Sequence, residues 1–163
     1  RSSYYLTCDR VNGVLTVYTD STMRIPIKTI RVSVGKAGTE TPTGTWTMHR
    51  AGRWQELMGP SWGQYGTHVV NGIFVHSVAC GQANSYNLPV GEYLRLGNPA
   101  SHGCIRACVA DAKWVWDNCN GSKIHIFDGT YTSNEALKGP LGRKALTPLR
   151  GSKNFDPTDP ACK

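Results

Sequence analysis

The chain has 163 residues, of which 39% are hydrophobic and 18% charged, and its formal net charge at pH 7 is +7. A chain of this length is most simply one domain that buries about two-thirds of its unfolded surface, so its fold does not depend on cross-links. The composition excludes a disordered tail, and no apolar run approaches the ~20 residues that span a bilayer. Lys and Arg are scattered and form no nucleic-acid motif, so the charge favours a polyanionic matrix, such as a bacterial wall, over a nucleic acid.

Short β-type runs dominate the first half of the sequence. They cover residues 15–18, 25–34, 45–48 and 69–78, and a Gly- and Trp-rich loop is expected over 52–66. This spacing of β-type runs and turn residues predicts an antiparallel sheet protein. The chain begins RSSYYL, without an initiator methionine or a signal-peptide pattern, so we expect a mature form or a fragment.

One later segment has the period of a helix. Apolar residues recur there at intervals of three and four, as on one face of an amphipathic helix: Ile105, Cys108, Val109, Ala112, Val115, Trp116 and Cys119. Asn120-Gly121 is expected to end this helix, and residues 123–127 return to strand. We therefore expect one domain over residues 1–128, with a C-terminal tail over 129–163 that packs on it or extends it.

A cysteine lies in the turn where this helix is expected to begin, in the sequence Ser101-His102-Gly103-Cys104. Near a helix N-terminus Cys104 is expected to be acidic, because unpaired N–H groups and the helix dipole favour a thiolate. Gly103 allows a sharp turn, and successive amides near Cys104 could point at an oxygen that becomes negative during attack. His102 is too near in sequence for its ring to reach the thiol, so His76, at the end of another strand, is the expected base.

Two other roles for the cysteines remain open. Six cysteines suggest an oxidising compartment, and a nucleophile would leave five whose pairing is undetermined: Cys8, Cys80, Cys108, Cys119 and Cys162. A zinc site is the second alternative, although a four-residue spacing suits helices better than the end of a strand; its ligands would be His76, Cys80, Cys104 and Cys108. The other histidines are expected on the surface or in packing contacts: His49, His68 and His125.

The sequence Ser101-His102-Gly103-Cys104-Ile105-Arg106 resembles the catalytic signature of the L,D-transpeptidase family, in which a histidine lies upstream of Ser/Thr-His-Gly-Cys. Residues 35–45 resemble the family's strand-turn segment, 74–77 its histidine strand, 111–114 the helix after its cysteine and 156–160 a tail seen in some members. The resemblance covers most of the chain from about residue 4 to residue 127. His76 and Cys104 lie 28 positions apart, more than the commonest family spacing, so we expect an inserted loop over 80–92 beside the site.

The resemblance implies a mostly β, L,D-transpeptidase-like sandwich with a short α-helix after the cysteine. It implies that Cys104 is the nucleophile, His76 the general base and acid, and Ser77 the residue that orients His76. His102 and Gly103 would shape the turn and the oxyanion region.

Substrate contacts are expected from Ser101, Arg106 and Tyr86. Arg106 could hold a substrate carboxylate, and a structural ion pair is the alternative. Other aromatic side chains could line the cleft or pack in the core and loops: Trp54, Trp62 and Tyr65.

The implied reaction forms 3→3 peptidoglycan cross-links through a cysteine thioester and releases D-Ala from a tetrapeptide stem. An L,D-carboxypeptidase acting on the same stems and a non-catalytic wall-binding module are the alternatives. No cofactor and no metal are expected. The implied partners are peptidoglycan stem peptides and, as covalent inhibitors, carbapenems and other β-lactams. The expected setting is a monomer in the bacterial wall or periplasm, secreted or anchored by a segment outside this sequence, with a role in wall biogenesis and cell shape.

Overall fold

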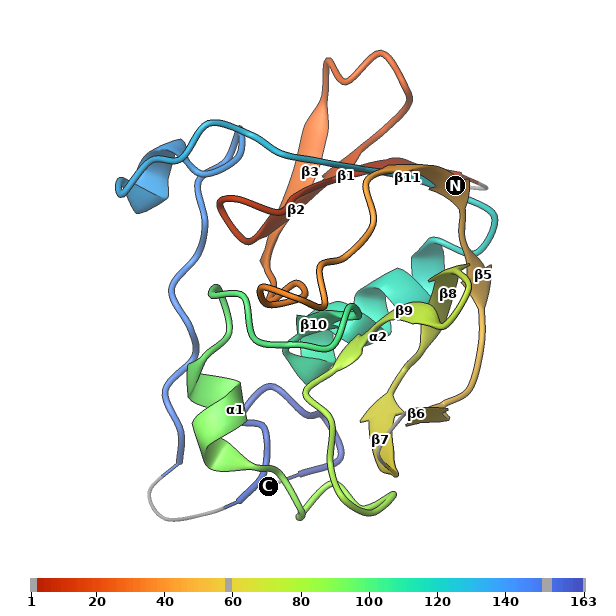
Figure 1. Ribbon diagram of the computed structural model, residues 1–163, viewed down its shortest axis with the longest axis vertical. Helices are drawn as coiled ribbons and strands as arrows, with labels where there is room; N and C mark the ends of the chain where they lie inside the picture. Colours follow the sequence, from red (N-terminus) through yellow and green to blue (C-terminus); the bar gives the residue numbers. More distant parts are fainter. Residues whose placement is uncertain (1–2, 58–59, 151–153, 163) are drawn as a thin grey trace.

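The computed structural model describes residues 3–57, 60–150 and 154–162. Its largest sheet has five strands in the order β3-β2-β1-β11-β4 (Figure 1). These strands are β1 (Tyr5–Asp9), β2 (Val14–Tyr18), β3 (Pro26–Arg31), β4 (Gly44–Thr47) and β11 (Lys123–Phe127). β1 and β11 are parallel, although more than a hundred residues separate them in the sequence.

A second sheet carries the cysteine turn. Its four strands follow the order β10-β9-β8-β5 and are β5 (His49–Arg50), β8 (Thr67–Val70), β9 (Ile73–Ser77) and β10 (Ile105–Ala107). β9 and β10 are parallel, so the prediction of a purely antiparallel protein is wrong for this pair and for β1 with β11. The long crossover that a parallel pair requires is supplied here by the segment between Ser77 and Ile105.

The expected loop over 52–66 is also wrong, because it contains a hairpin. β6 (Trp54–Leu57) and β7 (Ser61–Gln64) pair in antiparallel register as a two-stranded sheet. Its Gly and Trp residues predicted a loop, but each residue of β6 pairs with a residue of β7, as Trp54 does with Gln64. A short hairpin with few apolar residues gives only a weak periodic signal.

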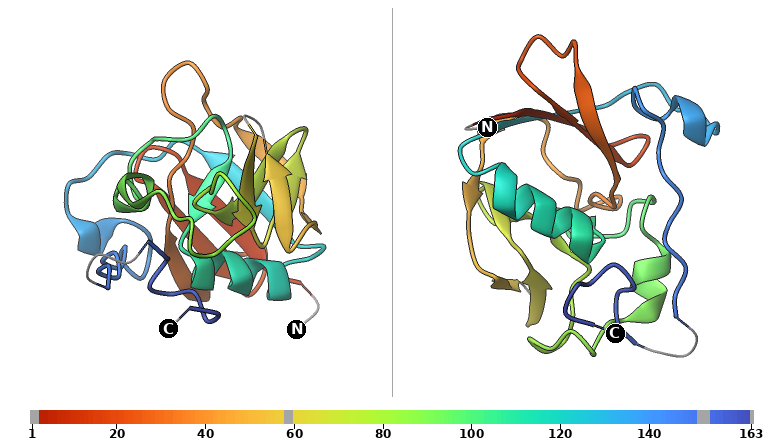
Figure 2. Two further views of the ribbon diagram at one scale, coloured as in Figure 1. Left: turned by 90° about the horizontal axis from the view of Figure 1, so that it is seen from below. Right: turned by 180° about the vertical axis from the view of Figure 1, so that it is seen from behind.

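One hydrophobic core joins the two larger sheets. Leu6 and Ile124 from the first sheet and Val75 and Ile105 from the second belong to the same buried cluster. Helix α2 (Val109–Asn118) packs beside both sheets and contributes Val115 to this cluster (Figure 2). The prediction of a mostly β protein with a short helix after Cys104 is confirmed. No helix in the described ranges is long and apolar enough to cross a membrane.

The helix begins later than the sequence pattern predicts. Ile105–Ala107 forms β10, and Cys108, in an extended conformation, is the N-cap of α2. Ile105 and Ala107 are both buried, with relative exposures of 0% and 1%, and Arg106 between them is less buried. This segment therefore fits the alternating pattern of a strand as well as the three- and four-residue pattern of a helix. Pairing with β9 decides between the two, and a propensity pattern cannot include that contact.

The insertion after β9 contains the short helix α1 (Val90–Leu94). Tyr93 is fully buried and packs in a small apolar cluster with Val78, Leu88 and Leu96. Its hydroxyl donates to the carbonyl of Thr147 (2.7 Å), which ties the insertion to the tail.

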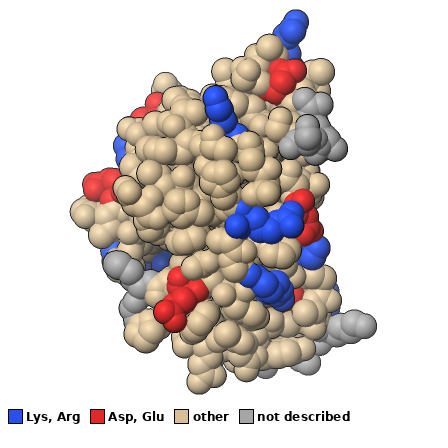
Figure 3. All heavy atoms as spheres, turned by 90° about the vertical axis from the view of Figure 1, so that its right-hand side faces the viewer, with Lys and Arg blue, Asp and Glu red and all other residues tan. Residues whose placement is uncertain are grey.

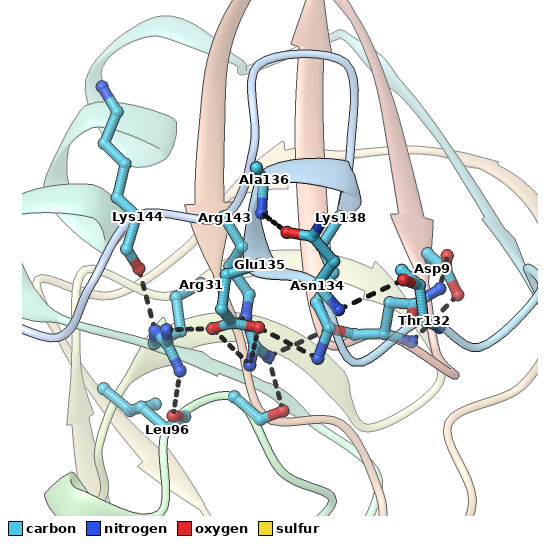
Figure 4. Close-up of polar contacts among 12 residues, drawn as sticks. Asp9, Arg31, Leu96, Thr132, Asn134, Glu135, Ala136, Lys138, Arg143 and Lys144 are labelled. Carbon is cyan, nitrogen blue, oxygen red and sulfur yellow. Dashed lines mark hydrogen bonds and ion pairs between the residues drawn. The ribbon is translucent and has the colours of Figure 1, made fainter.

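The tail is fastened to the first sheet by Glu135, in the 3₁₀ turn η1 (Glu135–Leu137), and by contacts of its first residues with Asp9 and Asn12 (Figure 4). Glu135 is paired with Arg31 (2.6 Å), Arg143 (2.9 Å) and Lys138 (3.1 Å). Burial raises the pKa of Glu135, but hydrogen bonds from Arg143, Lys138 and Arg31 outweigh it and lower the pKa to about 2. We call these four residues the Glu135 clasp.

The positive charge is dispersed on one face of the molecular surface (Figure 3). On the face shown in Figure 3, Lys and Arg form separate small groups, some beside Asp or Glu, and most of the surface carries neither sign. Such a distribution matches the scattered Lys and Arg of the sequence and forms no continuous basic stripe on this face.

Candidate active site

The site is built on two neighbouring parallel strands. β10 pairs with β9 so that Arg106 lies opposite His76, and Cys104 immediately precedes β10. Because alternate residues of a strand share a face, Phe74 and His76 on β9 lie on the same side as Cys104 and Arg106. Ile105 occupies the opposite face and is buried in the core. The core therefore sets the position of the cysteine.

These side chains face a cavity of about 470 Å³. Five of the sequence-predicted residues contribute to it: His76, Ser101, His102, Cys104 and Arg106. The other lining residues within the described ranges are Glu56, Leu57, Ser61, Gly72, Ile73, Phe74 and Ala79. The structure thus brings the expected nucleophile and base to one cavity from positions 28 residues apart.

His76 is held as a neutral imidazole. It is 1% exposed, and its Nδ1 lies in hydrogen-bonding contact with the Ser77 carbonyl. Because a carbonyl can only accept, Nδ1 carries the proton, and the lone pair of Nε2 can accept a proton, as a general base must. Burial lowers the pKa of His76 to about 4; the contact with Ser77 opposes this change, and the charge of Arg106 adds to it.

The wall behind the imidazole is the backbone of β7. A Cβ built on Gly63 would lie 2.6 Å from His76 Nδ1 and 2.8 Å from Cγ. No side chain fits at that distance, so glycine allows the strand to approach the ring closely.

The Cys104 thiol contacts the backbone of β9 and the preceding turn. The Phe74 N–H donates to Cys104 Sγ (3.5 Å), and the thiol donates to the Gly72 carbonyl (3.5 Å). Burial raises the pKa of Cys104, and the Phe74 N–H and the charge of Arg106 offset only part of this effect. The expectation of an acidic thiol at a helix N-terminus is therefore wrong, because β10 separates Cys104 from the start of α2 at Val109.

The cysteine turn is fixed by its own hydrogen bonds. Ser101 Oγ donates to the Cys104 carbonyl and accepts from the Gly103 N–H (3.1 Å). Gly103 has φ +126°, and a Cβ there would lie 2.9 Å from Ile73 Cδ1. Since the Gly103 N–H already has an acceptor, it is not available to an oxyanion; the Cys104 N–H has no hydrogen-bond acceptor among the described residues.

A threonine that sequence reasoning did not single out supports this turn. Thr41, fully buried, donates its hydroxyl to the Gly103 carbonyl (2.6 Å) and accepts from the Gly35 N–H (2.9 Å). It belongs to residues 35–45, which resemble the family's strand-turn segment. Its physical role is to join the two segments that carry the motifs.

Arg106 forms an ion pair with the inserted segment. Its Nη1 lies 3.1 Å from Glu92 Oε2 on α1, and the side chains are 12% and 38% exposed. Arg106 therefore forms the structural ion pair that was expected as the alternative, and it also lines the cavity. The expectation that the insertion over 80–92 borders the site is supported by Glu92, which contacts this cavity residue, although no described residue of 80–92 lines the cavity itself.

Ser77 and the aromatic residues lie differently from their expected places. The Ser77 hydroxyl accepts from the Gln64 N–H (2.8 Å), and only its carbonyl contacts His76. Tyr86 is half exposed and packs edge-on against Phe155, at 5.7 Å between ring centroids, outside the cavity lining. The other aromatic candidates also lie outside that lining in the part of the chain described: Trp54, Trp62 and Tyr65.

All six cysteines are free thiols. Cys108 and Cys119 lie at opposite ends of α2, and no group of three or more His, Cys, Asp or Glu side chains within the described ranges is placed to hold a metal ion. The four-ligand zinc alternative therefore does not form. Sequence reasoning missed Glu56, Leu57 and Ser61, since their hairpin was taken for a loop.

The chain matches one family over most of its length. Residues 3–136 match the YkuD family, the L,D-transpeptidase catalytic domain. The putative L,D-transpeptidase YciB of Bacillus subtilis (strain 168) is 59% identical over 27 residues, which are 17% of this chain and 14% of that protein.

Two solved structures show the same fold. An L,D-transpeptidase from Mycobacterium tuberculosis H37Rv has a TM-score of 0.61 and 19% identity, over 77% of this chain and 58% of that one. The complex of the L,D-transpeptidase LdtMt1 with imipenem has a TM-score of 0.58 and 21% identity, over 77% and 59%. The chain therefore spans less than two-thirds of the length of these relatives. At such identities the likeness confirms the predicted fold and no more.

Proposed function

The chain belongs to the L,D-transpeptidase catalytic-domain family, and from that premise we propose that it is a cysteine-dependent L,D-transpeptidase that forms 3→3 cross-links between peptidoglycan stem peptides. The observation that carries the proposal is the placement of His76 and Cys104 on one face of two paired strands, at one cavity. Nucleophilic catalysis needs this combination of a thiol and a positioned base.

In the first half-reaction, Cys104 attacks the carbonyl at the L-centre of diaminopimelate, the third residue of a tetrapeptide stem. A sulfur–carbon bond forms while the thiol proton passes to Nε2 of His76. Collapse of the tetrahedral intermediate breaks the peptide bond, and the imidazolium returns the proton to the amine of the departing D-alanine. A thioester on Cys104 remains.

In the second half-reaction, the side-chain amine of another stem attacks the thioester. His76 accepts the proton lost by the amine and returns it to the Cys104 sulfur as the carbon–sulfur bond breaks. One amide bond is thereby exchanged for another, with no net oxidation. Water in place of the amine would give the carboxypeptidase reaction.

Charge that develops on the carbonyl oxygen needs hydrogen-bond donors. The Cys104 N–H is the donor of the turn that supports this role, because the Gly103 N–H is bonded to Ser101. Arg106 lines the cavity with donors beyond the one used by Glu92, which supports recognition of a substrate carboxylate. We place the activity outside the cytoplasm, in the bacterial wall or periplasm, where the net charge of +7 favours an anionic matrix.

Mass spectrometry of purified tetrapeptide stems incubated with the protein tests the proposal. A cross-linked dimer is the expected product; a tripeptide alone would indicate a carboxypeptidase, and unchanged substrate a wall-binding module. Cys104→Ala and His76→Ala should each abolish turnover while thermal unfolding remains cooperative, and the double variant should be no worse than either one. Loss of activity in His102→Ala, with activity kept in His76→Ala, would contradict the assignment of the base.

Carbapenems provide an independent test. The complex of LdtMt1 with imipenem supports a carbapenem as the probe, and opening of its strained ring by Cys104 keeps the leaving nitrogen tethered. Intact-mass measurement should show one adduct, and peptide mapping should locate it on Cys104. An adduct on another cysteine would contradict the nucleophile assignment.

A further inference from the structure

The end of the chain reaches the back of the candidate active site. Residues 154–162 lie beyond the segment that matches the family and fold back beside the start of α2 and the insertion (Figure 2). Phe155, Asp156 and Asp159 are buried, with relative exposures of 2%, 2% and 3%. Such burial is unusual for carboxylates, which need partners when they leave water.

Asp159 is linked to His76 through a short series of buried contacts. Its Oδ2 accepts from Gln64 Nε2 (3.0 Å). The Gln64 backbone N–H donates to the Ser77 hydroxyl (2.8 Å), and the Ser77 carbonyl contacts His76 Nδ1. Gln64 is 3% exposed and Ser77 1% exposed, so water does not compete for these groups.

Gln64 also fixes the strand that forms the wall behind the imidazole. It follows Gly63, whose Cα lies against the His76 ring. Its Oε1 accepts from Arg53 Nη1 (2.9 Å), so the amide nitrogen is the atom that faces Asp159. The Gln64 side chain, at the end of β7, is thus held by Arg53 at its oxygen and by Asp159 at its nitrogen.

Asp159 is itself anchored in the fold. Its Oδ1 accepts from the Ala161 N–H (2.9 Å), and its N–H donates to the Asp156 carbonyl (3.0 Å). Asp156 Oδ2 in turn accepts from the Val109 N–H (2.8 Å) and so caps α2. The segment is therefore attached to the helix independently of Gln64.

We propose that Asp159 and Gln64 are positioning residues of the reaction and that the C-terminal segment completes the catalytic centre without touching substrate. Asp159 holds the Gln64 amide, Gln64 holds the end of β7 against Ser77, and β7 holds the imidazole at the thiol. The proposal rests on the proposed function in one respect, the role of His76 as the base for Cys104.

Loss of the Asp159–Gln64 hydrogen bond should change the position of the His76 ring. Without Asp159, the buried Gln64 amide has no acceptor and must move or recruit water. Movement of β7 releases the ring from Gly63, and a shift of about 1 Å in a reacting group costs up to roughly 10²-fold in rate. Water that enters behind the ring would also reverse the burial that now lowers the pKa of His76.

The test measures how fast iodoacetamide alkylates Cys104 in the full chain at several pH values between 5 and 8. Mass spectrometry of the Cys104 peptide monitors the reaction. Asp159→Ala and Gln64→Ala should each slow alkylation by roughly tenfold or more at pH 7. They should also change the shape of the pH profile, because a less buried His76 gains its proton at a higher pH. The double variant should be no slower than either single variant, as expected for residues in one network. A role in stability alone would leave the shape of the pH profile unchanged.

Glu135→Gln is the control, because it weakens the contacts of another tail carboxylate that lies outside residues 154–162 and does not contact Gln64. It should lower the melting temperature and leave the alkylation rate at that of the wild type. A wild-type rate in Asp159→Ala, or equal slowing in folded Glu135→Gln, would overturn the proposal. So would a wild-type rate in His76→Ala.

The outcome is separable from that of the proposed function. Alkylation does not need a stem peptide, so a wild-type protein that forms no cross-links can still show slowing by Asp159→Ala. That result would contradict the transpeptidase assignment and support the positioning role.

Discussion

Protonation of His76 should control the stability of the folded protein below neutral pH. The imidazole is 1% exposed, and its pKa falls from 6.5 to about 4 on folding, mainly through burial. Between these two values the unfolded chain binds a proton that the folded chain does not, so the free energy of unfolding decreases as pH falls. From pH 7 to pH 5 the decrease from this residue is about 2 kcal/mol.

Thermal unfolding at pH 5, 6 and 7, compared with the variant His76→Gln, measures this contribution. Gln is neutral and keeps a donor for the Ser77 carbonyl, so the variant retains the other titrating groups and loses only the imidazole. The melting temperature of the wild type should fall by roughly 4–8 °C more than that of the variant over this range. Parallel curves for the two proteins would refute the assignment of a buried, neutral imidazole at position 76.

Three further substitutions test the site and its support. Gly63→Ala should reduce Cys104 acylation by a carbapenem roughly 10²-fold, because its Cβ would lie 2.6 Å from His76 Nδ1. The control Gly91→Ala, whose Cβ would have nothing within 4 Å, should be acylated at the wild-type rate. Equal rates in the two variants would contradict the close packing of Gly63 against the ring. Glu135→Gln should lower the melting temperature at pH 7, and this difference should disappear as pH falls from 4.5 to about 2, where the wild-type carboxylate gains its proton; a difference that persists would contradict the clasp. Glu56→Gln should lower the ratio of cross-linked dimer to tripeptide, since Glu56 is the cavity's carboxylate among the described residues and suits a cationic acceptor amine; an unchanged ratio would exclude that role.

Local patterns in the sequence predicted the parts of the fold that local contacts determine. The strand over 123–127 and the end of the helix near Asn120 follow from apolar alternation and a glycine stop, and both occur in the structure. The start of the helix was misplaced because residues 105–107 satisfy two periods at once. Pairing with β9 on one side and hydrogen bonds between Arg106 and Ser33 on the other select the strand, and the contact with β9 joins residues about thirty positions apart.

The candidate site was predictable in its residue types and less so in its electrostatics. The motif around Cys104 and the strand ending near His76 identified two side chains that the structure places at one cavity. The acidity of the thiol depended on a helix position that was wrong, and the place of Tyr86 depended on packing with Phe155 in the tail. Contacts between segments so far apart leave no periodic signal in the sequence.

The opposite pKa changes of the two residues describe the ligand-free state of the pair. Burial raises the pKa of the Cys104 thiol and lowers that of the His76 imidazole, so at their common cavity both favour a neutral thiol and a neutral imidazole over a thiolate–imidazolium pair. In the proposed mechanism the nucleophile forms as the proton moves to His76 during attack, so the rate depends on the position of the ring. This dependence gives Gly63, Ser77 and the buried Gln64 amide a chemical consequence. The neutral state of the pair also protects the thiol while no substrate is bound, because a neutral thiol oxidises more slowly than a thiolate.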